Sequence, residues 1–432
     1  MNSPLSSSRP VVLVDTFSFH TFINSGYFYC WHLSEIYDVV LLVAPNDEQS
    51  PPIKALCATQ RIKRVIVLPE RSCRWAIHAW FVRRLPALLN ELQPTIVLMN
   101  NWHSFHQKYL SRVVRRFSPL ARIIVCLSVH APVTDFAVTD YRLREASLVK
   151  WRERWWWMPG PLANLFYHLW GRWLGWRDFL ILPLLLSGFP LRETHNPWRG
   201  KLISKDTGNL FDAVLCYAPY EQDAYLMEME ERHKIHLVQH PMTLSADGVE
   251  VLFPTENVES PTVVLPSCCL DYNVPESTEQ QISRLEAIWG QALEIIQRRT
   301  GGKIIWWKLH PGFVDDPTML GLTQRLEERF PNFVSMTGKM TAEAMIVSAS
   351  LVVGDVSTVL QWASRFGRCR TLSLDIFGVE GGDEMGAIPD LTVIRSFADL
   401  EEVDLQAHKK NDQDYALSYP TPIEFLESIE RE

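Results

Sequence analysis

The stretch LVVGDVSTVLQWASRFGRCRTLSL, residues 351–374, contains one complete strand, helix and strand pattern. The segments LVVGD (351–355) and RTLSL (370–374) are short apolar runs, and the intervening VLQWASRFG (359–367) has apolar residues at helical spacing. Two buried strands joined by a helix are typical of a parallel sheet that helices cover on both faces. This stretch therefore predicts an α/β domain.

The same alternation fills the rest of the second half of the chain. Strands are expected at TVVLPS (262–267), KIIWWKL (303–309) and FVSMT (333–337), and helices at 276–300, 318–330 and 341–349. The first half repeats the pattern with seven strand-like runs, at 11–15, 38–45, 64–69, 95–100, 122–128, 212–217 and 235–239. A helix near 421–431 could return to the first domain or stay with the second.

A length of 432 residues exceeds the size at which single cores usually stop growing. We predict a first Rossmann-like acceptor domain over 1–244 and a second Rossmann-like nucleotide-donor domain over 262–432. A polar, proline-bearing linker over 245–261 would join them. Ligands of doubly wound domains bind beyond the carboxyl ends of the strands, so the cleft between the two domains is the expected site.

Composition restricts the class of protein further. Apolar residues make up 47%, charged residues 21%, and the net charge is −8, which favours a globular protein and argues against binding to nucleic acid. The eight cysteines include no C-x-x-C pair, which suits a reducing compartment. The start of the chain does not resemble a secretory signal. We therefore expect a cytoplasmic protein.

A tryptophan-rich insertion at 151–201 fits neither domain and holds eight of the sixteen tryptophans. Between Arg142 and Lys201 there are ten Lys or Arg residues against four Asp or Glu. Prolines interrupt its apolar runs, which are too short to span a bilayer. Tryptophan with interspersed arginine favours an anionic membrane surface, so we predict peripheral attachment to the inner face of the cytoplasmic membrane. The alternative is an apolar insertion packed against the protein or a partner subunit.

Two polar motifs follow predicted strands of the second domain. Lys308 lies near the end of the run IIWWKL (304–309), His310 follows the run, and Pro311 restricts the backbone directly after the imidazole. Ser357 and Thr358 begin a helix, where unpaired N–H groups and the helix dipole favour a phosphate. Since both loops can lie at one edge of the sheet, we predict a phosphate cradle. Simpler interpretations are a helix cap, a histidine bonded to a local carbonyl, and a lysine that points away.

The combination of K-L-H-P with D-x-S-T about 45 residues later resembles the second domain of GT-B transferases that use cytidine-nucleotide donors. These include bacterial sialyl- and Kdo-transferases and the CDP-glycerol phosphotransferases. The resemblance covers residues 262–400 by motif, and the first domain only by its strand rhythm. It implies that His310, Ser357 and Thr358 contact the donor phosphate and that His310 stabilises charge on the departing nucleotide.

Further contacts to the donor are predicted in loops of the second domain. Ser267, which ends the strand at 262–267, is a candidate for nucleotide binding, and the loop after it is positioned to meet base or ribose. Glu380, Asp383 and Glu384 of EGGDEMG (380–386) are candidates for contacts to sugar or ribose hydroxyls. The first domain lacks the acidic pair followed by glycine that is typical of the bacterial sialyltransferases of this group, which puts a sialic acid donor in doubt.

A direct displacement needs a base that removes the proton of the acceptor hydroxyl. Candidates in the first domain follow predicted strands: Asp15, His20 and His130, with His103 and Asp135 as further polar residues of those loops. The HP pair in VQHPM (238–242) favours a hinge or domain contact over catalysis. No residue pattern calls for a metal ion or a cofactor.

These features together predict a metal-independent GT-B glycosyltransferase at the membrane face. It would move a Kdo- or sialic-acid-like sugar from a cytidine-nucleotide donor to a surface glycan or lipid-linked acceptor. Its partners would be the activated donor, that acceptor and an anionic membrane surface, with no nucleic acid. Two alternatives are a CDP-glycerol-type polyol-phosphate transferase and a non-catalytic GT-B-like membrane scaffold. An epimerase of the same two-domain shape is a third.

Overall fold

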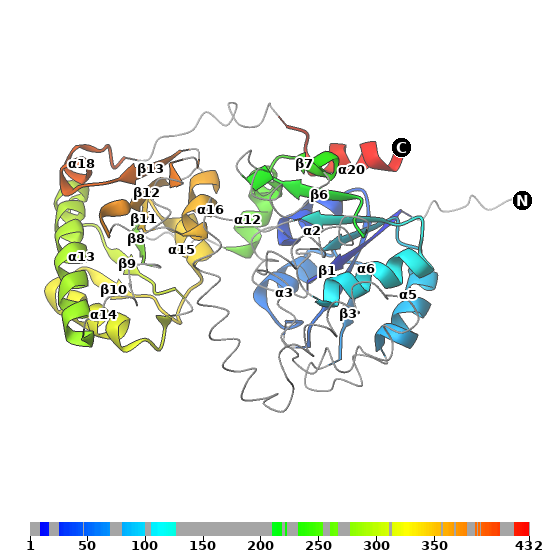
Figure 1. Ribbon diagram of the computed structural model, residues 1–432, viewed down its shortest axis with the longest axis horizontal. Coiled ribbons are helices and arrows are strands. Elements are labelled where there is room, and N and C mark those ends of the chain that lie inside the picture. Colours follow the sequence, from blue (N-terminus) through cyan, green and yellow to red (C-terminus); the bar gives the residue numbers. More distant parts are fainter. Residues whose placement is uncertain are drawn as a thin grey trace, which may run out of the picture. The chain divides into compact units, whose positions relative to one another are not determined.

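The computed structural model describes most of the chain outside the region between β5 and β6 (Figure 1). The described residues are 9–16, 26–45, 47–69, 80–99, 105–126, 210–217, 221–222, 232–253, 260–266, 277–310, 313–355, 357–366, 369–377, 385–386, 388, 390–406 and 419–431. They form two compact units. The first holds the described residues up to Gly248 and those from Tyr419 onward, and the second holds those between Val249 and Ser418.

The first unit is built on a parallel sheet with the order β3-β2-β1-β4-β5-β6-β7. Its strands are β1 (Val11–Asp15), β2 (Asp38–Val43), β3 (Arg64–Val67), β4 (Ile96–Met99), β5 (Arg122–Cys126), β6 (Ala213–Cys216) and β7 (Ile235–Leu237). All seven predicted strands are therefore present. Because β1 and β4 lie side by side, the switch point of this sheet lies between them.

Helices cover both faces of this sheet. They are α2 (Tyr27–Leu33), α3 (Pro51–Ala58), the π-helical η2 (Trp80–Arg84), α5 (Leu85–Leu92), α6 (Phe105–Phe117), the 3₁₀ helices η3 (Arg232–Lys234) and η4 (Pro241–Leu244), and α20 (Pro422–Arg431). The apolar sides of α5 and α6 pack on one face of the sheet, in a core that includes Leu89, Val113, Leu13, Val97 and Ile123. The polar sides of α5 and α6 therefore face outward, as is usual for amphipathic helices.

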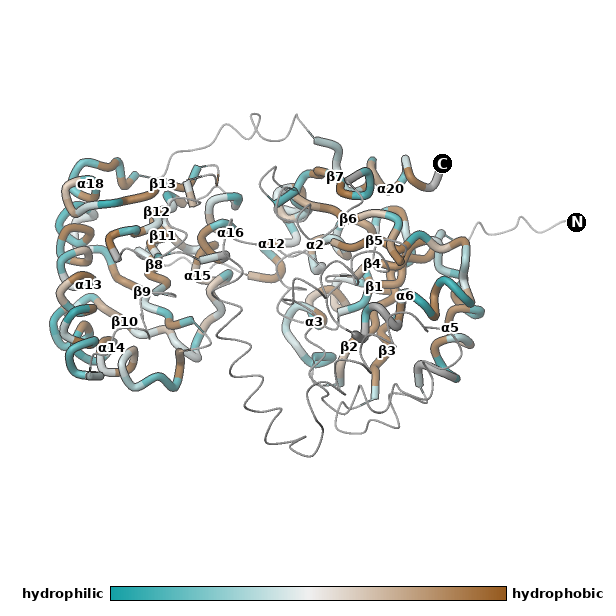
Figure 2. Tube along the Cα trace, in the orientation of Figure 1, coloured by the Kyte–Doolittle hydropathy of each residue, from teal (hydrophilic) through white to brown (hydrophobic). Residues whose placement is uncertain are grey.

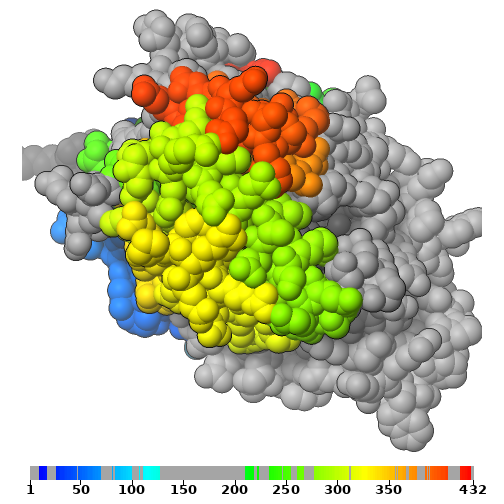
Figure 3. Space-filling model, turned by 90° about the vertical axis from the view of Figure 1, so that its left-hand side faces the viewer, coloured from blue at the N-terminus to red at the C-terminus, as the bar shows by residue number. Residues whose placement is uncertain are grey.

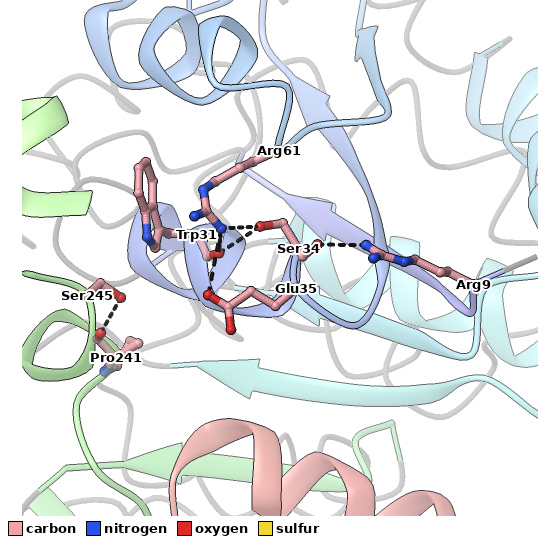
Figure 4. A network of polar contacts seen from close by, with 7 residues as sticks. All are labelled: Arg9, Trp31, Ser34, Glu35, Arg61, Pro241 and Ser245. Atoms are coloured by element: carbon pink, nitrogen blue, oxygen red, sulfur yellow. Dashed lines mark hydrogen bonds and ion pairs between the residues drawn. The ribbon is translucent and has the colours of Figure 1, made fainter. Parts of the chain in front are cut away.

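The carboxyl end of α2 is held by a network around Arg61, which lies between α3 and β3 (Figure 4). Its guanidinium carbon is 4.0 Å from the centre of the Trp31 ring, and its Nη1 donates to the Trp31 carbonyl and to the Ser34 hydroxyl, both at 3.0 Å. Glu35 lies 3.8 Å from the same nitrogen, and Arg9 donates to the Ser34 carbonyl at 3.1 Å. Charged donors therefore satisfy carbonyls that a helix end leaves without partners.

The C-terminal helix α20 packs on the first unit, so the chain returns to the unit in which it began. The Gln239 side chain donates to the Tyr419 carbonyl at 2.8 Å, and its backbone N–H donates to the Pro420 carbonyl at 3.0 Å. Phe425 of α20 stacks against His236 of β7 with ring centres 4.6 Å apart. These contacts show that the predicted helix near 421–431 returns to the first domain.

The second unit contains a parallel sheet with the order β10-β9-β8-β11-β12-β13. Its strands are β8 (Thr262–Leu265), β9 (Ile305–Trp307), β10 (Phe333–Ser335), β11 (Leu351–Gly354), β12 (Arg370–Leu374) and β13 (Leu391–Ile394). Five of these match predicted strands, and β13 was not predicted. Both sheets thus have the doubly wound order, and the prediction of an α/β fold with two Rossmann-like domains is confirmed.

The helices of this unit are α13 (Thr278–Thr300), α14 (Pro317–Arg329), α15 (Ala342–Ser348), α16 (Thr358–Phe366), the 3₁₀ helix η6 (Asp375–Phe377) and α18 (Phe397–Glu402). Figure 2 shows hydrophobic and hydrophilic residues alternating along α13 and α14, and in Figure 3 these helices and α18 form one outer face. Under it, Trp307 of β9 is fully buried, with its ring centre 5.2 Å from that of Trp289. The apolar run that precedes Lys308 is therefore a core strand.

Two features differ from the predicted boundaries. The segment 245–261, expected to be a linker, contains the helix α12 (Ala246–Leu252), and the division between the two units falls inside this helix, after Gly248. The Tyr27 hydroxyl donates to the Gly248 carbonyl at 3.1 Å, which ties the start of α12 to α2. The polar composition of the segment reflects its exposed positions, while Val249, Leu252 and Phe253 are buried. The residues from Tyr419 onward belong to the first unit, as described above.

The close approach of three elements at Gly354 gives a test of the second core. A Cβ at this position would lie 2.7 Å from the Leu265 carbonyl oxygen and 3.2 Å from Leu360 of α16. Because a backbone atom cannot yield as a side chain can, Gly354→Ala is expected to lower the free energy of unfolding by about 1–3 kcal/mol. Denaturant unfolding measures this effect.

Gly290→Ala is the matched control for this substitution. Gly290 lies inside α13, and a Cβ there would meet only the guanidinium end of Arg329, which can move. Alanine also favours helix, so the control is expected to change the free energy of unfolding by less than about 1 kcal/mol. Equal effects of the two substitutions would contradict the tight packing inferred at Gly354.

Candidate functional site

The candidate site lies at the carboxyl edge of the second sheet. In the order β9-β8-β11, the central strands β8 and β11 flank the switch point, and all three strands are parallel. Lys308 and His310 follow β9, and Ser357 follows β11, so both motifs lie at the same edge. Two strand spacings separate β9 from β11, which is about 10 Å. This is the crevice in which open α/β sheets bind their ligands.

His310 is exposed between two anchored residues. Leu309 is buried in the core, and its N–H donates to the Thr337 hydroxyl at 3.1 Å. On the other side, the Phe313 N–H donates to the His310 carbonyl at 2.8 Å, and the Phe313 ring centre lies 5.9 Å from that of the imidazole. The backbone of the motif is therefore held on both sides of the imidazole.

Lys308 is oriented by the alternation of β9. Ile305, Trp307 and Leu309 are buried in the core, while Trp306 and Lys308 are only half-buried. The Lys308 N–H continues the ladder by donating to the Val264 carbonyl at 3.0 Å. In an extended strand, alternate residues point to the same side. The Lys308 side chain therefore lies on the side of the strand opposite to the core, away from α13 and α14.

The electrostatics of this motif favour an anion. Although His310 is exposed, the protein around it withdraws the imidazole partly from water, which lowers its pKa, and the neighbouring Lys308 ammonium lowers it further. Partial burial also lowers the pKa of Lys308, and the carboxylate of Glu343 opposes that shift. Positive charge on Lys308 and on His310 at the same time is unfavourable. A negative ligand beside them would stabilise the charged form of each, and would therefore favour the charged form of His310.

Ser357 caps α16. Its hydroxyl oxygen accepts a hydrogen bond from the Val359 N–H at 3.3 Å, and its carbonyl accepts one from the Leu360 N–H at 3.2 Å. The structural interpretation as a helix cap is thus correct for this residue. It does not exclude ligand binding, because a hydroxyl that accepts one bond can still donate another. Thr358 is the first residue of α16.

Asp15 lies at the carboxyl end of β1, beside the switch point of the first sheet. It is 1% exposed, and the following residue, Thr16, donates from its hydroxyl to the Leu42 carbonyl at 2.8 Å. The other predicted site residues lie outside the described residues: His20, His103, His130, Asp135, Ser267, Pro311, Glu380, Asp383 and Glu384. So does the insertion at 151–201. Their predicted roles stay predictions.

The second histidine-proline pair, His240-Pro241, packs inside the first unit. His240 is 5% exposed, accepts a hydrogen bond at Nδ1 from the Met242 N–H at 3.2 Å and caps η4. Its ring lies 4.4 Å from that of Tyr217, whose N–H donates to the buried Glu221 at 2.6 Å. These contacts account for both His240 and Glu221 within one packed cluster.

Three residues of the site were given no role by the sequence reasoning. Thr337, in the loop after β10, holds the backbone of the K-L-H-P motif through Leu309. Asp355 is fully buried directly before the turn into α16, and Gly354 permits the close approach of β8. Asp355 is the first residue of the D-x-S-T motif, so the motif itself could have drawn attention to it. Nothing in the local sequence around Thr337 indicates its partner.

Two doubly wound units in one chain define the GT-B fold class, to which this protein belongs by architecture. A candidate UDP-N-acetylglucosamine 2-epimerase from Listeria monocytogenes is similar, with a TM-score of 0.53, 10% identity, and coverage of 91% of this chain and 86% of that one. UDP-GlcNAc 2-epimerase from Neisseria meningitidis, bound to UDP-GlcNAc, has a TM-score of 0.50 at 10% identity, covering 91% and 89%.

Anabaena HepE, in complex with UDP and glucose, has a TM-score of 0.49 at 10% identity and covers 98% of both chains. No protein-family model and no curated protein matches the sequence. At these identities the similarity concerns the fold. Within the described part of the chain, no three His, Cys, Asp or Glu residues are grouped as metal ligands. None of the helices described has the length and apolar character needed to cross a bilayer.

The lowered pKa of His310 predicts how pH affects anion binding. A bound phosphate favours the charged imidazole, so the pKa of His310 is higher in the complex than in the free protein. Affinity is then greatest below the free pKa and falls as pH rises through the pKa of the complex. The total fall is about tenfold for each unit of difference between the two pKa values.

CMP methyl ester is the appropriate probe, because a phosphodiester keeps one charge across this range. Calorimetric titration between pH 5 and 8 should show the fall for the wild-type protein and a flat profile for His310→Gln. An affinity that rises with pH would contradict an anion beside His310.

Proposed function

We propose that this protein is a transferase that moves a sugar from a nucleotide-activated donor, with its donor phosphate at the Lys308, His310 and Ser357 cluster. A cytidine nucleotide is the proposed donor class, and a Kdo- or sialic-acid-like sugar is the group moved. The acceptor is a surface glycan or a lipid-linked glycan. The observation that carries this proposal is the position of both motifs at the switch point of one parallel sheet.

The cluster suits a departing nucleotide. When the bond from the sugar to the phosphate breaks, negative charge grows on the phosphate oxygens, and preorganised donors stabilise that charge. The His310 imidazole, the Lys308 ammonium and the Ser357 hydroxyl can each donate a hydrogen bond, and the N-terminal N–H groups of α16 add a partial positive charge. These groups can supply the neutralisation that the reaction needs without a metal ion.

The acceptor hydroxyl must lose its proton as it attacks the sugar. Asp15, the last residue of β1, is one proposed base. His20 and His130 are the other proposed bases. A carboxylate at a switch point can accept the proton of an acceptor hydroxyl that binds beside it.

Peripheral attachment at the inner face of the cytoplasmic membrane completes the proposal, with the tryptophan-rich insertion at 151–201 as the contact to anionic lipid. A lipid-linked acceptor would make that location useful. Glu380, Asp383 and Glu384 are the proposed contacts to sugar or ribose hydroxyls, and Ser267 and Pro311 complete the proposed nucleotide contacts.

Titration with CMP, CDP and UDP tests the donor class. The proposal expects binding of CMP and CDP with affinities at least tenfold above that for UDP. Binding of UDP alone would reject the cytidine assignment and favour an epimerase, since the similar Neisseria structure holds UDP-GlcNAc. Conversion of UDP-GlcNAc to its epimer, followed by NMR, would then identify that activity.

A CDP-glycerol-type polyol-phosphate transferase is the second candidate, because the same two motifs would hold the same leaving group, CMP. The product separates the two reactions. A glycosyl transfer adds no phosphorus to the acceptor, whereas a polyol-phosphate transfer adds one phosphodiester, which the product mass reveals. A GT-B-like scaffold without catalysis would bind no nucleotide and release none from any donor.

A further inference from the structure

The hydrogen-bond ladder between β9 and β10 ends directly before the His310-Pro311 pair. Strand β9 is parallel to β10, and the Ile305 N–H donates to the Asn332 carbonyl at 2.9 Å. In a parallel ladder, every second N–H of a strand faces the same neighbour. Leu309 is in phase with Ile305, so its N–H faces the β10 side as well. In this register the carbonyl opposite that N–H is the carbonyl of Met336.

A side chain takes the place of this carbonyl, because the chain turns after β10. The Met336 carbonyl accepts from the Lys339 N–H at 2.9 Å, which closes the turn. Gly338, the third residue of the turn, has a φ of +76°, which favours glycine. The Leu309 N–H donates to the Thr337 hydroxyl at 3.1 Å. The Thr337 side chain thus supplies the acceptor that the turn removes from the ladder.

This hydrogen bond is adjacent to the imidazole of the candidate site. On the β8 side of β9, the Lys308 N–H donates to the Val264 carbonyl at 3.0 Å, so the backbone ladder holds that residue. On the β10 side, the residue directly before His310 is held through the Thr337 hydroxyl. Two successive N–H groups, on opposite sides of the strand, therefore fix the direction in which the chain reaches His310. Removing the Thr337 hydroxyl would remove this restraint on the β10 side.

We infer that Thr337 is a positioning residue, whose hydroxyl orients the His310 imidazole toward the donor phosphate. The inference rests on the proposed function, since it requires an anion beside His310. A displacement of about 1 Å at a reacting group can lower a rate about 100-fold, so one hydrogen bond next to the imidazole is sufficient to affect the reaction. A hydrogen bond that served only to anchor the loop would affect stability and leave anion binding unchanged.

Calorimetric titration of the full-length protein with CMP methyl ester tests the role of Thr337. Thr337→Val keeps the shape of the side chain but removes the acceptor, and Thr337→Ser keeps the hydroxyl. The ratio of the affinity at pH 5 to that at pH 8 measures the contact between the imidazole and the phosphate. Thr337→Val should lower this ratio at least about threefold, and Thr337→Ser should preserve it. In the His310→Gln background, Thr337→Val should change the affinity less than about twofold, because Thr337 acts through His310.

Thr341→Val is the matched control. Thr341 belongs to the same loop, and its hydroxyl accepts from the Ala344 N–H at 3.2 Å, as the N-cap of α15. Its replacement weakens the loop and keeps the hydrogen bond between Leu309 and Thr337. The unfolding temperature should therefore fall, as it should for Thr337→Val, while the affinity ratio stays within about twofold of wild type.

The NMR order parameter of the His310 backbone amide in the free protein separates this inference from the proposed function. It should fall from about 0.85, which is typical of rigid backbone, toward about 0.6 in Thr337→Val but not in Thr337→Ser. An unchanged order parameter or an unchanged affinity ratio in Thr337→Val would overturn the role of Thr337, while nucleotide binding by the wild-type protein stands. A wild-type protein that binds neither CMP nor its methyl ester would reject the proposed donor class. The order parameter alone would then decide whether Thr337 places His310.

Discussion

Replacing His310 by alanine is expected to lower turnover of a nucleotide-activated donor by about 100- to 1,000-fold, while the protein stays folded. Removal of one positioned donor to a developing negative charge has an effect of this size. The imidazole is exposed, and the backbone on either side of it is held by Thr337 and Phe313, which the substitution leaves in place. Release of nucleotide from the donor, with and without acceptor, measures the loss.

His233→Ala is the matched control, because His233 is an exposed histidine of η3 in the first unit. It should keep full turnover. His310→Gln keeps one N–H donor but cannot become charged, so it should retain more turnover than alanine and lose the pH dependence of binding. Turnover of His310→Ala within threefold of wild type would remove His310 from the proposed chemistry.

Replacing Ser357 by aspartate is expected to weaken binding of the nucleotide about 100-fold or more without unfolding α16. Aspartate is as good an N-cap as serine, so the hydrogen bond to the Val359 N–H is kept. Its charge would lie close to the donor phosphate. Two like charges about 5 Å apart repel by about 3 kcal/mol at the effective dielectric constant of a protein surface. Calorimetric titration with CMP measures the loss, and thermal unfolding checks the cap.

Two further variants separate capping from phosphate binding. Ser396 is the N-cap of α18, where its hydroxyl accepts from the Asp399 N–H at 3.1 Å, so Ser396→Asp makes the same exchange away from the switch point. It should leave nucleotide affinity within about threefold. Ser357→Ala removes the cap and should lower the free energy of unfolding by about 1 kcal/mol. If Ser357→Asp binds CMP as wild type does, the phosphate does not lie at the start of α16.

Much of both units follows from local pattern alone. The run at 370–374 and the run at 11–15 coincide with β12 and β1 residue for residue. The start of α13 is local as well, since Ser277 and Gln280 exchange capping hydrogen bonds, and the helix ends at Gly301 with a φ of +72°. Such features arise between residues that are close in the chain, so the sequence displays them directly.

Other elements depend on distant neighbours. Strand β13 is only four residues long, and what makes it a strand is its pairing with β12. Helix α12 occupies a polar segment, and its start is tied to Tyr27, more than two hundred residues away. The pairing of α20 with the first unit depends on contacts to Gln239 and His236. Composition could not indicate these partners, because burial is decided by the surface that a segment meets.

By itself the sequence determined the alternation of buried strands and amphipathic helices, and the position of the K-L-H-P and D-x-S-T motifs directly after two strands. These are properties of neighbouring residues. The order of the strands was decided only by the tertiary structure, and with it the meeting of the two motifs at one edge beside β8. The physical reason is that hydrogen bonding between strands depends on which chain segments pair, and segments about 45 residues apart become neighbours only when the whole sheet forms.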